Sequence, residues 1–168
     1  MTRAYYLSIT GMIIAVDAWT KFLIMSNFDL HRDSLVVIQN FFQIVHVRNS
    51  GAAFGIGANS NSPLVPWLLN AGAIGVFAFV AWLAFRSSLS DRLLQIGLHL
   101  IMGGAIGNLI DRFRLGSVVD FLDVFIVISG REHHWPAFNV ADSAICVGIG
   151  LLFLDMWRNP DREPVEAA

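Results

Sequence analysis

Charged residues are scarce in this chain. Asp, Glu, Lys and Arg make up 14% of the 168 residues, whereas hydrophobic residues make up 55%. Soluble domains carry roughly 25% charged residues, so this sequence has too little polar surface to cover a globule surrounded by water. The excess apolar surface must face lipid. The sequence therefore predicts an integral membrane protein, and its length is that of a single domain, residues 1–168.

Other absences narrow the possible functions. The single cysteine, Cys146, can form no intrachain disulfide, so cysteine usage leaves the redox compartment open. A net charge of −2 provides no basic stripe, and nucleic acid is not an expected partner. Glu132-His133-His134 suggests a metal site, but adjacent side chains point in different directions and a solvated loop explains the three residues. We expect no metal and no cofactor.

Four apolar stretches have the length of a spanning helix, which needs about 20 mostly apolar residues. Residues 64–85 and 93–110 contain no charge, and 138–157 contains acidic residues only near its ends. Residues 4–28 include Asp17 and Lys21, and we expect this stretch to be retained as a helix. The predicted fold is an all-α membrane protein with four transmembrane helices and a small β-rich element outside the membrane.

The β-rich element is expected in the two long connections, residues 29–63 and 111–137, which share one side of the membrane. Residues 44–49 alternate apolar and polar side chains, the pattern of a half-exposed strand. Residues 118–121 are extended and β-branched. An even number of spans places both termini on the other side. Basic residues flank both sides, so the positive-inside rule leaves the orientation open.

Polar side chains gather at one depth of the predicted spans, near the side of the long connections. Helical rise places there residues from all four spans: Asp17, Lys21, Asn70, Asn108, Asp111, Arg112, Asn139 and Asp142. An ionisable group within a span costs at least a few kcal/mol unless it is paired or faces water. Such groups are functional candidates by default.

Structural explanations exist for several of these residues. Asp17 and Lys21 are four residues apart, so they can neutralise each other on one helix face. Asp111 can anchor a helix end at the headgroups. Asn139 and Asp142 have the spacing of a helix cap followed by an acid in the first turn. Asp120 is harder to explain in this way, because its neighbours along the chain are apolar.

Two carboxylates are the best candidates for chemistry. The histidines and Cys146 offer no plausible pairing, since His99 lies mid-span and Cys146 lies within another span. Two close aspartates cannot both ionise at neutral pH. The ionised one can take a proton from water while the neutral one protonates a carbonyl oxygen, which hydrolyses a peptide bond. Asp142, in a first helical turn, is expected to be the ionised member, and Asp120 the proton holder.

Five motifs in order along the chain resemble the lipoprotein signal peptidase (signal peptidase II) family, aspartyl proteases of bacterial membranes. The motifs are Asp17–Lys21, Asn49–Phe54, Gly103–Arg112, Val118–Phe121 and Phe138–Ser143. One departure is Ala18, where the family usually has Gln. The resemblance implies that Asp120 and Asp142 are catalytic. It implies substrate-binding or supporting roles for Asn49, Asn108, Arg112, Asn139, Asp17, Lys21 and Gly104.

The resemblance also implies a substrate and a location. The substrate is a prolipoprotein whose cysteine carries diacylglycerol, and the family cleaves just before that cysteine. We expect a monomer surrounded by lipid in the bacterial cytoplasmic (inner) membrane, with several spans and an active site near the extracytoplasmic face.

Two other functions compete with this prediction. A small ion-coupled transporter would use Asp17, Lys21 and Asp142 as a relay, and it would spread polar residues through the depth of the membrane. A membrane chaperone that only binds signal sequences would tolerate Asp120→Asn and Asp142→Asn, whereas a protease would not.

Overall fold

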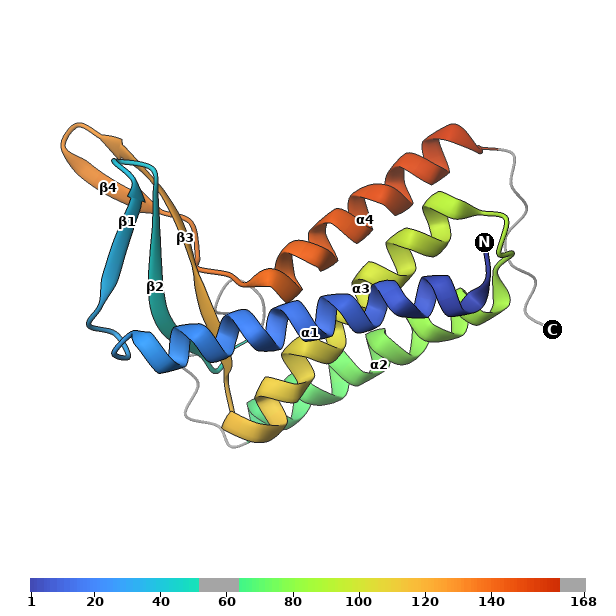
Figure 1. Cartoon of the computed structure of the whole chain (residues 1–168), viewed down its shortest axis with the longest axis horizontal. Helices are drawn as coiled ribbons and strands as arrows, with labels where there is room; N and C mark the ends of the chain where they lie inside the picture. Colours follow the sequence, from blue (N-terminus) through green and yellow to red (C-terminus); the bar gives the residue numbers. More distant parts are fainter. Residues whose placement is uncertain (52–63, 161–168) are drawn as a thin grey trace.

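A bundle of helices carries a small sheet at one end (Figure 1). The computed structural model describes residues 1–51 and 64–160. The helices are α1 (Arg3–Asn27), α2 (Leu64–Arg86), α3 (Arg92–Leu115) and α4 (Val140–Arg158). The strands are β1 (Ser34–Ile38), β2 (Phe42–Asn49), β3 (Val118–Ile128) and β4 (Arg131–His134). The N-terminus and the α2–α3 turn lie at the end of the bundle away from the sheet, called here the turn end.

The helices lie close to the four predicted spans. α1, α3 and α4 are each long and apolar enough to cross a membrane. α2 has 23 residues, and the part of it whose side chains are described without gaps, Asn70–Arg86, is apolar but shorter. α3 continues five residues beyond the predicted end at residue 110 and stops at Gly116, whose φ of 71° ends the helix in the left-handed region. The described part of the chain is therefore mostly helical, and within it three helices are suited to spanning.

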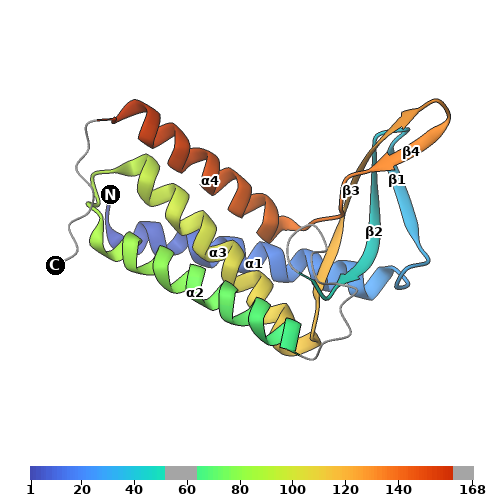
Figure 2. The ribbon, with the colours of Figure 1, turned by 180° about the vertical axis from the view of Figure 1, so that it is seen from behind.

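α3 is the central helix and packs against α1, α2 and α4, as seen from behind in Figure 2. Small residues allow its close approach to α4. A Cβ added to Gly97 would lie 2.9 Å from the Gly148 carbonyl oxygen, and one added to Gly104 would collide with the Ala141 carbonyl oxygen. Large apolar side chains such as Phe22 and Phe153 are at least 60% exposed on the outer surface of the bundle, as expected of a surface that faces lipid.

The sheet is antiparallel, in the order β1-β2-β3-β4. The predicted strands at residues 44–49 and 118–121 are confirmed as parts of β2 and β3. β4 was predicted as a loop, because Glu132, His133 and His134 are polar; that prediction was wrong. The outer element is thus a four-stranded sheet, larger than predicted. Its β3 is held to the bundle because Val119 and Phe121 pack against Ile24 of α1.

Candidate active site

Asp120 lies on β3 at the junction of the sheet and the bundle, where it is only 3% exposed. Its Oδ1 accepts a hydrogen bond from Asn139 Nδ2 at 2.8 Å, and its Oδ2 accepts one from Asn49 Nδ2 at 3.1 Å. Burial, with a further contribution from the nearby Asp142 carboxylate, raises the pKa of Asp120 to about 7. This carboxyl group can therefore hold a proton near neutral pH.

Asp142 lies in the first turn of α4 and is half-buried. Its Oδ1 accepts from Asn108 Nδ2 at 2.7 Å, and its Oδ2 accepts from the Asn139 backbone N–H at 3.2 Å. The Asp142 N–H donates in return to Asn139 Oδ1 at 2.9 Å, which completes a capping box. The predicted cap is confirmed. The Asn139 side chain does more than cap, because its Nδ2 contacts Asp120 while its Oδ1 contacts Asp142 N–H.

A buried cation lies beneath the two aspartates. Lys21 is 1% exposed, and its Nζ lies 2.8 Å from Asp17 Oδ2, 3.0 Å from Asp111 Oδ2 and 3.1 Å from Asn108 Oδ1. The predicted pairing of Asp17 with Lys21 is confirmed. Asp111, by contrast, does not anchor a helix end at the surface, since it is buried against Lys21. The three charged groups form one buried cluster of α1 and α3.

The same cluster orders the segments that carry the aspartates. Asp17 Oδ1 accepts from the Ala141 N–H, next to Asp142, and Asp111 Oδ2 accepts from the Val119 N–H, next to Asp120. Asn108 has its amide oxygen toward Lys21, so its amide nitrogen points to Asp142. One lysine thereby fixes the start of α4, the start of β3 and the orientation of an amide.

Arg112 and Gly104 occupy the remaining predicted positions. The half-buried Arg112 donates from Nη2 to the Gly51 carbonyl at 3.3 Å and interacts electrostatically with both aspartates. Gly104 touches neither carboxylate; it lies against the Ala141 backbone and sets the spacing of α3 and α4. Residues 52–54 of the second motif lie outside the described residues, so the structure places only its Asn49–Gly51 part.

The sequence reasoning undervalued Asp111. Asn108 and Asp111 are three residues apart on α3, so they share a helix face. Both contact Lys21 in the structure. The spacing indicates a shared role for Asn108 and Asp111. The position of Asp111 near the predicted helix end favoured the other interpretation, an anchor at the headgroups.

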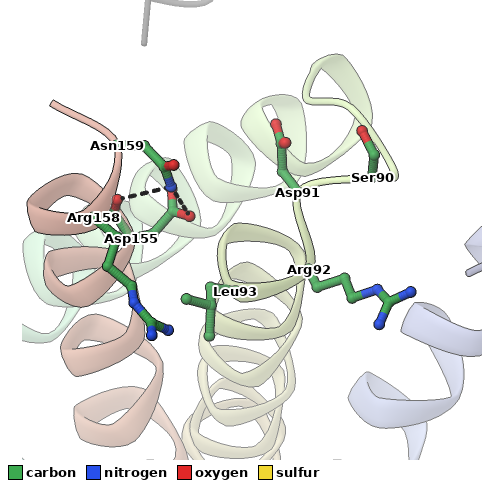
Figure 3. A pocket seen from close by; sticks show the side chains of 7 residues that line it. All are labelled: Ser90, Asp91, Arg92, Leu93, Asp155, Arg158 and Asn159. Atoms are coloured by element: carbon green, nitrogen blue, oxygen red, sulfur yellow. Dashed lines mark hydrogen bonds between the residues drawn. The ribbon is translucent and has the colours of Figure 1, made fainter. Parts of the chain in front are cut away.

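A cavity of about 510 Å³ lies at the turn end (Figure 3). It is lined by Ser90, Asp91, Arg92, Leu93, Asp155, Arg158 and Asn159. None of the predicted site residues lines it. Asn159 Nδ2 donates there to the carboxylate and to the carbonyl of Asp155, four residues earlier in the chain. This arrangement is that of a helix C-terminus.

The apolar helices and the small antiparallel sheet define a multi-pass membrane protein. Two solved structures share the fold. A bacterial membrane enzyme solved by the in meso method at 2.3 Å resolution matches with a TM-score of 0.80 and 26% identity, over 99% of this chain and 95% of that one. A second, at 1.9 Å, matches with a TM-score of 0.77 and 28% identity, over 94% of this chain and 95% of that one.

Sequence comparison gives the family. Residues 9–158 match the family described as signal peptidase (SPase) II. The chain is 50% identical to the lipoprotein signal peptidase of Syntrophotalea carbinolica over 93% of this chain and 92% of that one. It is 44% identical to that of Geobacter sulfurreducens over 96% of each. The chain belongs to the signal peptidase II family.

Proposed function

We propose that this protein removes the signal peptide from diacylglyceryl-modified prolipoproteins as an aspartic endopeptidase, cutting just before the lipidated cysteine. The relatives are lipoprotein signal peptidases, which supports prolipoproteins as the substrates. One observation supports the aspartic mechanism: a single side chain, Asn139, holds Asp120 with its amide nitrogen and the start of the Asp142 helix with its amide oxygen. Such a bridge keeps two carboxyl groups in a fixed relation.

In the proposed reaction, the Asp142 carboxylate takes a proton from a water molecule. The water oxygen attacks the scissile carbonyl carbon, and Asp120 donates its proton to the carbonyl oxygen. The tetrahedral intermediate then collapses: the C–N bond breaks, the leaving amine takes the proton that Asp142 received from the water, and a hydroxyl group of the intermediate returns a proton to Asp120 as the new carboxylic acid forms. The pKa of about 7 for Asp120 suits a proton donor near neutral pH. The two groups titrate as a pair, so the measured ionisations will belong to both.

The hydrogen-bond donors around the pair have distinct proposed roles. Asn49 and Asn108 each hold one carboxylate oxygen on one aspartate. Arg112 presents a planar set of donors beside both aspartates, and we assign it to binding the substrate backbone. Lys21, Asp17 and Gly104 act at a distance from the reacting atoms, through Asn108 and the start of α4.

We further propose that α2 spans the membrane together with the other three helices, as one domain, and that the sheet lies on the extracytoplasmic side of the inner membrane. Arg3, Arg86, Arg92 and Arg158 then lie on the cytoplasmic side, and the basic residues toward the sheet serve the site and the substrate instead of topology. A signal peptide is itself a membrane helix, so a site at the bilayer edge meets the scissile bond without extracting the substrate. Lipid surrounds the helices and receives the substrate's acyl chains. Since one chain supplies both aspartates and their donors, a monomer is sufficient.

The test is cleavage of a diacylated prolipoprotein by the purified protein in detergent or liposomes. Asp120→Asn and Asp142→Asn should each lower the rate by roughly 10²–10⁴-fold, the usual contribution of a general acid or base. Asp155→Asn is the matched control, because Asp155 is a buried acid of α4 at the turn end, and it should leave the rate unchanged. Cleavage that survives either substitution would rule out the pair, and loss of cleavage with a chelator would indicate a metal instead. If the protein is a protease, both variants should still bind the prolipoprotein and leave its signal peptide uncleaved.

A further inference from the structure

One carboxylate joins three strands of the sheet on the face opposite to Asp120. Asp123 of β3 is 7% exposed, and its Oδ2 accepts from Gln43 Nε2 of β2 at 2.7 Å. His134 Nδ1 of β4 lies 2.9 Å from the same oxygen and 3.0 Å from Oδ1. Asp120 and Asp123 are three residues apart on one strand, so their side chains point to opposite faces. Asp123 is therefore not a second candidate for contact with the substrate.

His134 is held from several sides. Its Nε2 lies 3.2 Å from Glu132 Oε2, and its ring stacks on Phe125 with 4.9 Å between the centroids. The charged groups that face it are Asp123 from β3 and Glu132 from its own strand, while Gln43 of β2 brings no charge. The hydrogen bond to Asp123 is the main cause that raises the pKa of His134 above its ordinary value of 6.5. At pH values below that raised pKa the imidazolium is paired with two carboxylates.

The His134–Asp123 pair lies on the stretch of chain between the two candidate catalytic aspartates. Asp123 follows Asp120 by three residues, and His134 precedes Asn139 by five. Beyond His134 the returning chain stays bonded to β3. Trp135 N–H donates to the Val124 carbonyl at 2.8 Å, and Phe138 N–H donates to the Leu122 carbonyl at 3.0 Å. The pair thus closes the β3–β4 hairpin at its base, and the chain runs from there directly to Asn139.

We propose that His134 and Asp123 are positioning residues, which fix the distance between β3 and the segment leading to Asn139 and so hold Asn139 against both aspartates. The proposal rests on the proposed function, because positioning is defined by the reaction it serves. Neither residue touches the reacting groups. Asn139 must reach Asp120 at 2.8 Å and cap α4 at the same time. A displacement of about 1 Å at a catalytic group can cost roughly 10²-fold in rate, so a looser hairpin has a measurable effect.

The experiment compares kcat of the whole protein on a diacylated prolipoprotein for three variants between pH 6 and pH 9. His134→Ala removes the pairing and should lower kcat about tenfold at pH 6, with KM little changed. His134→Asn places an amide N–H where Nδ1 lies and should restore most of the rate. The matched control is His133→Ala, since His133 is exposed on the other face of the same strand; its kcat should equal that of the wild type.

The pH dependence separates positioning by the ion pair from a general folding defect. As pH rises through the raised pKa of His134, the imidazolium loses its charge and the pairing weakens. The ratio of the wild-type rate to the His134→Ala rate should therefore fall toward one between pH 6 and pH 9, whereas the ratio of the His134→Asn rate to the His134→Ala rate should stay constant, because the amide does not titrate. The ionisation of the catalytic pair cancels in both ratios. A ratio near one at all pH values overturns the proposal, and so does a deficit of constant size, which would indicate a misfolded hairpin.

A second readout does not depend on catalysis. The titration of His134 is followed by NMR in the Asp120→Asn variant, with the signal assigned by comparison with His134→Asn. We expect a pKa above 6.5 that returns toward 6.5 when Asp123→Asn is added. An unshifted pKa overturns the pairing itself. If the pKa is raised but Asp120→Asn still cleaves substrate, the proposed function fails while the pairing stands, so the two failures are distinguishable.

Discussion

The two ends of the helical bundle both contain buried acids, but they hold them differently. At the turn end, Asp155 of α4 accepts hydrogen bonds from Asn159, one helical turn away. At the sheet end, each acid also has a partner from a distant part of the chain: Asn108 is 34 residues from Asp142, and Asn49 is 71 residues from Asp120. The backbone partner of Asp17, Ala141, is 124 residues away.

This difference distinguishes polar residues that end a helix from polar residues that form a functional site. A helix can satisfy its last carbonyls with a residue of its own last turn, which requires no particular tertiary fold. A carboxylate held by donors from other helices and strands keeps its geometry only if the whole fold is in place. The size of the cavity does not make this distinction, since the cavity of Figure 3 lies at the turn end, away from both aspartates.

The largest difference between the two ends is expected when the buried cation, Lys21, is removed. Lys21→Met leaves Asp17 and Asp111 buried without their shared counter-charge, and breaking a buried ion pair in this way costs about 3–5 kcal/mol. We expect a large fall in the thermal unfolding midpoint in detergent, together with loss of cleavage. Arg92→Met is the control at the turn end, where the exposed side chain should contribute less than about 1 kcal/mol. Equal destabilisation by the two variants would remove the distinction between the two ends.

A smaller effect is expected from a methyl group between α3 and α4. Gly104→Ala would place its Cβ against the Ala141 carbonyl oxygen, and overpacking of this kind costs about 1–3 kcal/mol. The two helices must separate, which draws Asn108 away from Asp142, so kcat should fall more than stability alone explains. Gly150→Ala is the control in α4, because nothing lies within 4 Å of its added Cβ. That variant should gain about 0.5–1 kcal/mol, and a similar gain for Gly104→Ala would contradict the prediction.

The smallest effect concerns pH. With the pKa of Asp120 at about 7, cleavage should fall above pH 7, since the proton donor is lost as the carboxyl group ionises. The hydrogen bond from Asn49 favours the ionised form and lowers that pKa. Asn49→Ala should therefore raise the pKa of Asp120 and move the alkaline limb of the pH–rate profile to higher pH. Asn159→Ala, at the turn end, should leave the limb in place; a shift to lower pH with Asn49→Ala would refute the assignment of Asp120 as the donor.

The sequence predicted the helices well because apolar runs are long and charges end them. It failed where polar residues continue an element. α3 runs on through Asp111 and Arg112, since Lys21 and the Val119 N–H satisfy Asp111 inside the molecule. β4 was not predicted for the same reason: its polar side chains form hydrogen bonds with a neighbouring strand, such as the one between His134 and Asp123.

The candidate site was predictable residue by residue but not as a network. The spacing of Asp17 and Lys21 indicated a pair, and the spacing of Asn139 and Asp142 indicated a cap; both are present. Neither spacing indicates that Asn108 connects the pair to the cap. Contacts between residues far apart in the sequence have no local periodicity, so only the fold reveals them.

The bond between Asp17 and the Ala141 N–H has a consequence for biogenesis. A chain synthesised from its N-terminus inserts α1 long before α4 exists. During that interval Asp17 has only its pairing with Lys21, one turn away on the same helix, which lowers the cost of leaving two charges in the bilayer. The arrival of the last helix then supplies the remaining donor. If Asp120 and Asp142 act as proposed, we expect the nascent protein to lack protease activity until α4 has been inserted.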